Sequence, residues 1–334
     1  MTSASSNLIN KPFLLSPAGK DYLWGGNRLK SDFNKNIDLT PLAETWECST
    51  HPDGPSIVSN GEHKGKSLSQ VLSEHPEYLG TNNVANSELP VLIKFIDAEK
   101  DLSVQVHPSD DYAMEYENGS LGKTEMWYVL DATDDAKLVY GFKQDVDEET
   151  IKSALEKGVL EEYLNTVPIQ KGDVFFIPSG QVHAIGAGAL IAEIQQNSNL
   201  TYRLYDYNRR DKDGKLRELH IDKALAVSNM NSSSKPSQAT IKVKSTEEYD
   251  IEQISKCKYF QVDKINIHTE GNTTVDCNTG EETFNVFLCV DGQGTIMIDK
   301  EESMNINKGD CLFVPANSVK MKIIGNMYIL RTSC

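Results

Sequence analysis

Short runs in which apolar and polar residues alternate dominate the chain, and most are bounded by Gly, Pro, Asn or Asp. A period of two puts successive side chains on opposite faces of a β-strand, so these runs predict strands. The turn residues between the runs predict antiparallel neighbours. The predicted strands are Val91–Ile96, Leu102–His107, Met126–Leu130, Leu138–Tyr140, Val174–Ile177 and Leu190–Gln195. The pattern therefore predicts a mainly β protein.

Helical spacing of apolar residues is less common in this chain. In Ser67–Glu74 and Glu148–Lys157 the apolar residues recur every three to four positions, which predicts two short helices. The segment 231–239 is the most polar stretch and contains several serines and a proline. It is the best candidate for a linker between two domains.

An internal repeat lies on both sides of that candidate linker. Lys171–His183 begins Lys-Gly-Asp, continues with an apolar run and a Pro, and ends Val-His. The same frame returns 137 residues later in Lys308–Lys320, where Lys320 stands in the place of His183. A weaker echo of Thr124–Leu130 occurs in Thr283–Cys289, without the glutamate. The repeat predicts a duplicated small β-barrel in which only the first copy kept a site.

Length and charge limit the possible partners. The 334-residue chain is long enough for two domains, and its 39% hydrophobic and 25% charged residues are ordinary for a globular protein. A formal net charge of −16 argues against nucleic acid, because the phosphate backbone would be repelled. An anionic substrate would need a local cluster of Lys and Arg.

The cysteines and the N-terminus bear on the cellular compartment. The six cysteines show no Cys-x-x-Cys spacing and are interpreted as small buried hydrophobic residues in a reducing compartment. The N-terminus lacks a basic region followed by an apolar core, and no apolar run approaches the ~20 residues of a membrane span. We therefore expect a cytoplasmic protein with no membrane partner.

Four residues of the first copy could form one metal site. Gln105 and His107 lie two apart in an apolar run, so a strand would point both side chains to one face. Glu125 opens the next strand-like run, and His183 follows a predicted strand and turn. Two imidazoles, a carboxylate and an amide suit a divalent cation. A metal would also satisfy Gln105, whose buried amide would otherwise cost about 1–3 kcal/mol.

Three motifs carry a resemblance to a known family. They are Gln-Val-His-Pro at 105–108, Lys-Thr-Glu-Met-Trp at 123–127 and Gln-Val-His-Ala at 181–184. Their arrangement resembles the cupin frame, and their sequences resemble type I mannose-6-phosphate isomerase in its short two-cupin bacterial form. The resemblance extends over most of the chain, from Tyr22 to Asp206.

The resemblance implies a fold and a division into domains. The implied fold is mainly β, with two cupin-type (jelly-roll) β-barrels and a few short helices. Residues 1–235 would form the catalytic, metal-binding cupin domain. Residues 236–334 would form a C-terminal cupin-like domain without metal ligands.

The resemblance also implies roles for individual residues. One zinc ion per chain would be bound by Gln105, His107, Glu125 and His183. Arg203 and Lys123 match the active-site arginine and lysine of the family. Lys94 and Glu193 match positions that line the pocket, and Lys94 also interrupts an apolar run, where it either has a partner or extends to the rim. Trp24 and Trp46 are interpreted either as apolar walls for a sugar ring or as core residues.

Two positions depart from the family pattern. Longer members have a histidine just before the active-site lysine, where this chain has Gly122. Asn199 replaces an acidic residue that the family often has four positions before the arginine. The first departure calls a histidine-assisted ring opening into question, and the second removes a candidate proton carrier.

The implied reaction converts mannose 6-phosphate and fructose 6-phosphate into each other through an enediolate. Such a reaction needs a proton carrier, for which Lys123 and Glu193 are the two candidates. Arg203 would stabilise negative charge on the enediolate or the phosphate, unless it only pairs with Asp206. Arg209 or Arg210 could extend the cationic cluster.

Two other functions stay open from the sequence. One is an iron-dependent cupin oxygenase that uses the same ligands. The other is a non-catalytic sugar-phosphate sensor, which the two departures would suit. For the isomerase and for the sensor, the expected partner is a small-molecule sugar phosphate. The chain is expected to be a monomer or a homodimer.

Overall fold

The computed structural model describes residues 10–83, 88–210, 213–234, 240–271, 273–298 and 302–334. By its internal contacts the chain divides into two compact units. The central unit comprises Gly19–Trp46 and Val91–Gln238, and the terminal unit comprises Met1–Ala18, Glu47–Pro90 and Ala239–Cys334. Residues 235–239 of the predicted linker lie outside the described residues. The terminal unit therefore includes two N-terminal segments that the predicted division at residues 235 and 236 assigns to the first domain.

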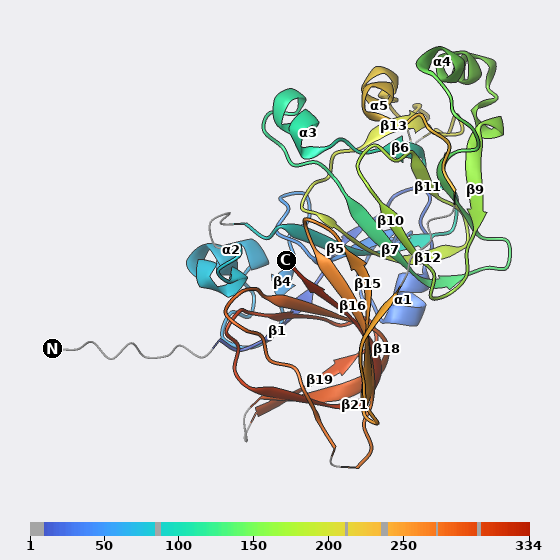
Figure 1. Ribbon diagram of the computed structural model, residues 1–334. Coiled ribbons are helices and arrows are strands. Elements are labelled where there is room, and N and C mark those ends of the chain that lie inside the picture. The colour runs from blue at the N-terminus through green and yellow to red at the C-terminus, as the bar shows by residue number, and fades with distance from the viewer. Residues whose placement is uncertain (1–9, 84–87, 211–212, 235–239, 272, 299–301) are drawn as a thin grey trace. The chain divides into compact units, whose positions relative to one another are not determined.

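The central unit is built on two sheets (Figure 1). The six-stranded sheet has the order β10-β7-β12-β5-β3-β2, and the five-stranded sheet has the order β13-β6-β11-β8-β9. The strands of the six-stranded sheet are β2 (Ala18–Lys20), β3 (Glu44–Cys48), β5 (Val91–Ala98), β7 (Glu125–Ala132), β10 (Val174–Ile177) and β12 (Ala189–Gln196). Those of the five-stranded sheet are β6 (Val104–Val106), β8 (Lys137–Phe142), β9 (Leu164–Pro168), β11 (His183–Ile185) and β13 (Tyr202–Tyr205).

The two sheets of the central unit pack their inner faces against one apolar core. Trp127 and Phe175 from the six-stranded sheet belong to the same cluster as Leu138 and Ile185 from the five-stranded sheet. Because side chains alternate along a strand, residues two positions away from these core residues also point inward. Polar side chains on these inner faces therefore lie next to the apolar core.

The central unit contains α1 (Arg28–Phe33), α3 (Asp110–Tyr116), α4 (Glu148–Lys157), α5 (Ile221–Val227) and the 3-10 turn η3 (Leu160–Glu162). Helices α4 and α5 pack on the outer face of the five-stranded sheet, whereas α1 packs on β5 of the six-stranded sheet. Val104 and Val106 pack with Ile151 of α4 and Leu225 of α5 in a second core. With these valines facing the helices, Gln105 between them is directed to the inner face, as the alternation predicted.

The terminal unit is built on one ten-stranded sheet. Its main path has the order β14-β15-β16-β21-β18-β20-β1-β4, with β17 paired to β21 and β19 paired to β18. The strands are β1 (Phe13–Ser16), β4 (Ile57–Val58), β14 (Ile241–Ser245), β15 (Tyr249–Lys256), β16 (Gln261–His268), β17 (Val275–Asp276), β18 (Asn285–Ile298), β19 (Glu302–Asn307), β20 (Cys311–Val314) and β21 (Met321–Ser333). The unit also contains α2 (Leu68–Glu74) and the 3-10 turn η1 (Pro76–Leu79).

The prediction of a mainly β protein is confirmed, and both predicted helices are present. Ser67 caps α2 in a capping box with Gln70, and Asp147 caps α4 by accepting from the Thr150 amide at 2.8 Å. No helix in the described part of the chain is long and apolar enough to cross a membrane.

The internal repeat is visible in the strands. β10 (Val174–Ile177) and β20 (Cys311–Val314) occupy the same place in the two copies of the frame. The weaker echo is displaced by one residue, however. Glu125 lies opposite Ile177, while the residue opposite Val314 is Asn285 rather than the aligned Phe284. The second copy therefore has an amide where the first has the carboxylate.

Candidate active site

Strand register brings three of the predicted site residues into one row of the five-stranded sheet. Gln105 on β6 lies opposite His183 on β11 on one side and opposite Arg203 on β13 on the other. Residues directly opposite in adjacent strands have close Cβ atoms. Residues 105, 183 and 203, which are far apart in sequence, therefore share one patch of the inner face.

A second row lies on the six-stranded sheet. Glu193 on β12 is opposite Lys94 on β5 and opposite Trp127 on β7. Two residues along the same strands, Glu125 lies opposite Gln195. The register therefore places the predicted ligand Glu125 on the same face of β7 as Trp127, which belongs to the inner core.

His107, Glu125 and His183 form a buried group that could hold a metal ion. Their donor atoms lie within 4.8 Å of one another. His107 Nε2 is 3.4 Å from Glu125 Oε2, and His183 Nε2 is 3.4 Å from Glu125 Oε1. Glu125 Oε1 accepts no hydrogen bond from the described residues. A buried carboxylate oxygen without a donor is costly, so this atom fits a cation.

Both imidazoles are held with one nitrogen directed at that carboxylate. His107 Nδ1 lies 2.8 Å from the Leu200 carbonyl, and His183 Nδ1 lies 2.8 Å from the Gln181 carbonyl. A carbonyl accepts only, so each Nδ1 donates and each Nε2 keeps a lone pair. Burial lowers the pKa of His107 well below its ordinary value and lowers the pKa of His183 to about 4. Both are therefore neutral near pH 7, which is the form that binds a metal.

The carboxylate of the group is also strongly affected by burial. Burial raises the pKa of Glu125 to about 7, and the nearby charge of Glu193 adds to the effect. A bound divalent cation would favour the ionised form instead. The tautomers, the unsatisfied oxygen and this carboxylate together fit a divalent metal.

Gln105 lies at the edge of the same group. Its Nε2 is 3.5 Å from His183 Nε2, and its Oε1 is 3.4 Å from the Ser103 hydroxyl. The orientation of an amide is assigned from its hydrogen bonds, and a half turn would exchange its oxygen and nitrogen. Gln105 is therefore close enough to the His183 imidazole to be considered a fourth ligand.

Lys123 is buried between the candidate ligands and a second carboxylate. Its Nζ lies 2.5 Å from Glu125 Oε2 and 3.1 Å from His107 Nε2. The distance from the same atom to Glu193 Oε1 is 3.9 Å. The Lys123 side chain is only 5% exposed, so it is not a solvated surface lysine.

Lys94 also has buried carboxylate partners, so it does not extend to the rim. Its Nζ lies 3.4 Å from Glu193 Oε1 and 3.7 Å from Glu44 Oε2. Burial alone would lower the pKa of Lys94, but the two carboxylates raise it above its ordinary value. Burial would raise the pKa of Glu193, but Lys123 and Lys94 lower it. Glu193 is therefore an ionised carboxylate next to two lysines.

Arg203 is not paired with Asp206 by a hydrogen bond or ion pair in the described part of the chain. Its Nε donates to the Ser103 hydroxyl at 3.3 Å, and its Nη1 donates to the Glu218 carbonyl at 2.7 Å. Asp206 instead accepts from Arg209 and Arg217.

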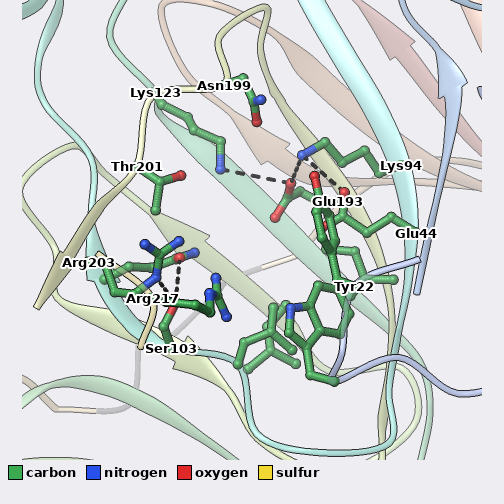
Figure 2. Close-up of a pocket in the computed structure, with 15 residues that line it drawn as sticks. Tyr22, Glu44, Lys94, Ser103, Lys123, Glu193, Asn199, Thr201, Arg203 and Arg217 are labelled. Carbon is green, nitrogen blue, oxygen red and sulfur yellow. Dashed lines mark hydrogen bonds and ion pairs between the residues drawn. The ribbon is translucent and has the colours of Figure 1, made fainter. Parts of the chain in front are cut away.

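A single pocket of about 290 Å³ collects these polar groups (Figure 2). It is lined by Tyr22, Trp24, Glu44, Lys94, Ile96, Leu102, Ser103, Gln105, Lys123, Ile185, Glu193, Asn199, Thr201, Arg203 and Arg217. Among the expected residues, Trp24 forms part of the wall, while Trp46, Arg209 and Arg210 do not line it. His107, Glu125 and His183 are not lining residues, but they contact two that are, since Lys123 lies next to His107 and Glu125, and Gln105 lies 3.5 Å from His183.

Several lining residues were missed by sequence reasoning. Glu44 accepts from the Trp46 indole at 2.7 Å and lies near Lys94, and its alternation with Trp46 on one strand was the signal that could have found it. Tyr22, Thr201 and Arg217 stand in segments without a regular pattern, so the sequence offered no comparable signal.

The fold and the site define a mainly β protein with a candidate divalent metal centre beside a polar pocket. Residues 13–137 match the family model for the catalytic domain of type I phosphomannose isomerase, and residues 250–334 match that for the cupin domain of mannose-6-phosphate isomerase. The chain belongs to the type I phosphomannose isomerase family, as the next comparisons also show.

The relatives cover almost the whole chain. The chain is 38% identical to mannose-6-phosphate isomerase ManA of Bacillus subtilis (strain 168) over 318 residues, which is 95% of this chain and 97% of that protein. It is 36% identical over 320 residues to mannose-6-phosphate isomerase of Streptococcus mutans, with 96% and 97% covered. The crystal structure of mannose 6-phosphate isomerase from Bacillus subtilis superimposes with a TM-score of 0.88 at 34% identity, covering 96% of this chain and 99% of that one.

Proposed function

We propose that this chain is a zinc-dependent isomerase that converts D-mannose 6-phosphate and D-fructose 6-phosphate into each other. The observation that carries the proposal is the buried group of His107, Glu125 and His183 next to Lys123 and Glu193 in one pocket. The relatives named mannose-6-phosphate isomerase support the choice of substrate.

The proposed ligands of the metal are Gln105, His107, Glu125 and His183. Two neutral imidazoles, one carboxylate and one amide oxygen form a set that suits zinc. When bound, zinc would supply Lewis-acid polarisation of the substrate carbonyl. The Glu125 oxygen that has no donor among the described residues supports a cation at this place.

The proton transfer is assigned to Lys123 and Glu193. Isomerisation removes the proton from C2 of the aldose and returns a proton to C1, with an enediolate between the two steps. Glu193 is ionised and could take the proton from the substrate. Lys123, whose Nζ lies 3.9 Å from Glu193 Oε1, could exchange a proton with it. Both residues line the pocket, so either could be the primary carrier.

Arg203, Lys94 and Trp24 would hold the substrate. Arg203 would stabilise the negative charge that develops on the enediolate oxygen or that the phosphate carries. Lys94 would keep Glu193 ionised and in place, since it lies 3.4 Å from that carboxylate. Trp24 would offer an apolar surface to the sugar ring.

Conversion measured in both directions, in ordinary water and in deuterium oxide, tests the proposal. We expect both sugar phosphates to interconvert, and fructose 6-phosphate to gain deuterium at C1, because a proton carrier exchanges with solvent. No exchange of the C2 hydrogen with solvent even after long incubation at equilibrium would indicate a direct hydride shift in place of the enediolate route. Tight binding without conversion would indicate the sensor, and oxygen uptake with the same ligands would indicate the oxygenase.

We also propose that the catalytic groups and the metal ligands belong to one part of the chain. Residues 1–235 would carry the catalytic groups, and residues 236–334 would carry none of the metal ligands. The cytoplasmic location and the monomeric or homodimeric state stay predictions.

A further inference from the structure

Arg217 is a charged residue of the pocket to which the proposed reaction assigns no role. It follows Leu216, which forms an isolated β-bridge to Arg210, and it lies outside the described helices and strands of the central unit. Its side chain is 22% exposed and lines the pocket together with Arg203. Figure 2 shows the two guanidinium groups on the same side of the pocket, away from Lys94 and Glu44.

A buried carboxylate holds Arg217 in this position. Arg217 Nη1 lies 3.4 Å from Asp206 Oδ1, and Arg209 donates to the same oxygen. Arg209 also donates to the Asp101 carbonyl, so its position is fixed from two sides. Asp206 is 4% exposed. The Asp206 carboxylate therefore positions the Arg217 guanidinium in the pocket lining and the Arg209 guanidinium outside it.

Positive charge is in excess at this side of the pocket. Asp206 is the buried carboxylate near Arg203, Arg209 and Arg217, while the carboxylate of Glu218 is 84% exposed, and Arg203 donates to two neutral oxygens. Burial lowers the pKa of Arg203, and the charge of Arg217 lowers it further. Two neighbouring cations in a partly buried site repel each other unless an anion lies between or beside them.

The opposite side of the pocket has a different balance. There the carboxylates of Glu44 and Glu193 are paired with Lys94, and Lys123 lies near Glu193. An anionic group of a ligand is therefore favoured at the arginine side only. This preference is notable in a chain whose formal net charge is −16.

We propose that Arg217 is a specificity-determining residue that binds the phosphate group of the sugar phosphate. The inference rests on the proposed function and deepens it. Arg203 lies opposite Gln105 in the sheet and so stands beside the candidate metal ligands, whereas Arg217 stands on a loop. Arg217 is therefore assigned to the phosphate, and the planar fork of its guanidinium suits two phosphate oxygens at once.

Substitution of Arg217 by glutamine tests this assignment. In Arg217→Gln we expect the KM for mannose 6-phosphate to rise about 10- to 100-fold, the range for loss of a hydrogen-bonded charged contact, while kcat changes much less. Competitive inhibition by inorganic phosphate should weaken by a similar factor. Arg210→Gln is the matched control, since it removes the same charge from the same segment without altering the pocket lining. It should keep the wild-type KM and phosphate inhibition.

Two further measurements keep the outcome clear. Arg217→Lys retains the cation next to Asp206, so it should fold like the wild type and show an intermediate KM. Calorimetric titration of the zinc-loaded protein with inorganic phosphate compares Arg217→Gln with the wild type without turnover. Unchanged phosphate binding in Arg217→Gln would overturn the role of Arg217. Absence of isomerisation in the wild type, with phosphate binding that still depends on Arg217, would overturn the proposed function alone.

Discussion

At the scale of single residues, the pocket is organised by ions removed from water. Lys94, Glu193 and Glu44 are each less than 10% exposed, and the ammonium lies within 3.7 Å of both carboxylates. Removing charges from water is costly, and the cost is compensated only while each charge keeps its partner. Because Lys94 interrupts an apolar run, the sequence predicted that this lysine either has a partner or extends to the rim. The alternation of Glu44 with Trp46 marks Glu44 as an inward-facing residue, but its pairing with Lys94 depends on how β3 and β5 are placed in the sheet, which no local run specifies.

Lys94→Met should therefore destabilise the protein strongly. The substitution leaves the buried carboxylates of Glu193 and Glu44 without this ammonium, so the free energy of unfolding in urea should fall by roughly 3–5 kcal/mol. Lys137→Met replaces an exposed lysine of β8 and should stay within about 0.5 kcal/mol of the wild type. A loss of less than about 1 kcal/mol in Lys94→Met would show that the three charges are not coupled as described.

At the scale of elements, local patterns predicted the strands and helices but not their partners. The alternation around Gln105 gave the correct face, and the helix at Glu148–Lys157 has the predicted bounds. The row formed by residues 105, 183 and 203 depends on the pairing of β13, β6 and β11, which are joined by long connections. Such pairing is set by the whole core rather than by any local run. The sequence could therefore supply the candidate residues through the family resemblance, whereas their distances required the structure.

Gly122 allows the loop that carries Lys123 to pass close to the start of α3. A Cβ at this position would lie 2.5 Å from the backbone of residues 109 and 110, at the start of α3. The close approach is accompanied by bonds from the Gly122 amide to Asp110 Oδ1 at 3.0 Å and from the Lys123 amide to the Pro108 carbonyl at 3.1 Å. The histidine that longer members have here would need a different backbone course.

Gly122→Ala should accordingly displace Lys123 and reduce turnover. A misplacement of about 1 Å can cost on the order of 100-fold in rate, so we expect kcat to fall by about 10- to 100-fold. Gly158→Ala serves as the control, because it lies at the end of α4 with open space around its Cβ and a φ of +69°. It should lower stability by about 1 kcal/mol and leave kcat unchanged. Wild-type kcat in Gly122→Ala would disprove the role of this close approach.

At the scale of the whole molecule, the chain combines two units with unequal chemistry. The repeat predicted two related β structures and a site in the first copy alone. The group of three candidate metal ligands found among the described residues lies in the central unit, and the lack of a site in the second copy stays a prediction. The grouping of residues 1–18 and 47–90 with the C-terminal region was not predicted. These segments join the terminal sheet through β1 and β4, and β1 pairs with β20 near the other end of the chain, a pairing that no local pattern specifies.

We propose above all that this chain is an isomerase that depends on one zinc ion held by Gln105, His107, Glu125 and His183. The most direct test is to strip the protein of metal with a chelator, add zinc in steps, and measure the rate of mannose 6-phosphate isomerisation at each step. We predict no activity before addition, a linear rise, and a plateau at one zinc per chain. Full activity in a sample shown to be metal-free, or a plateau only at two zinc ions per chain, would contradict the account.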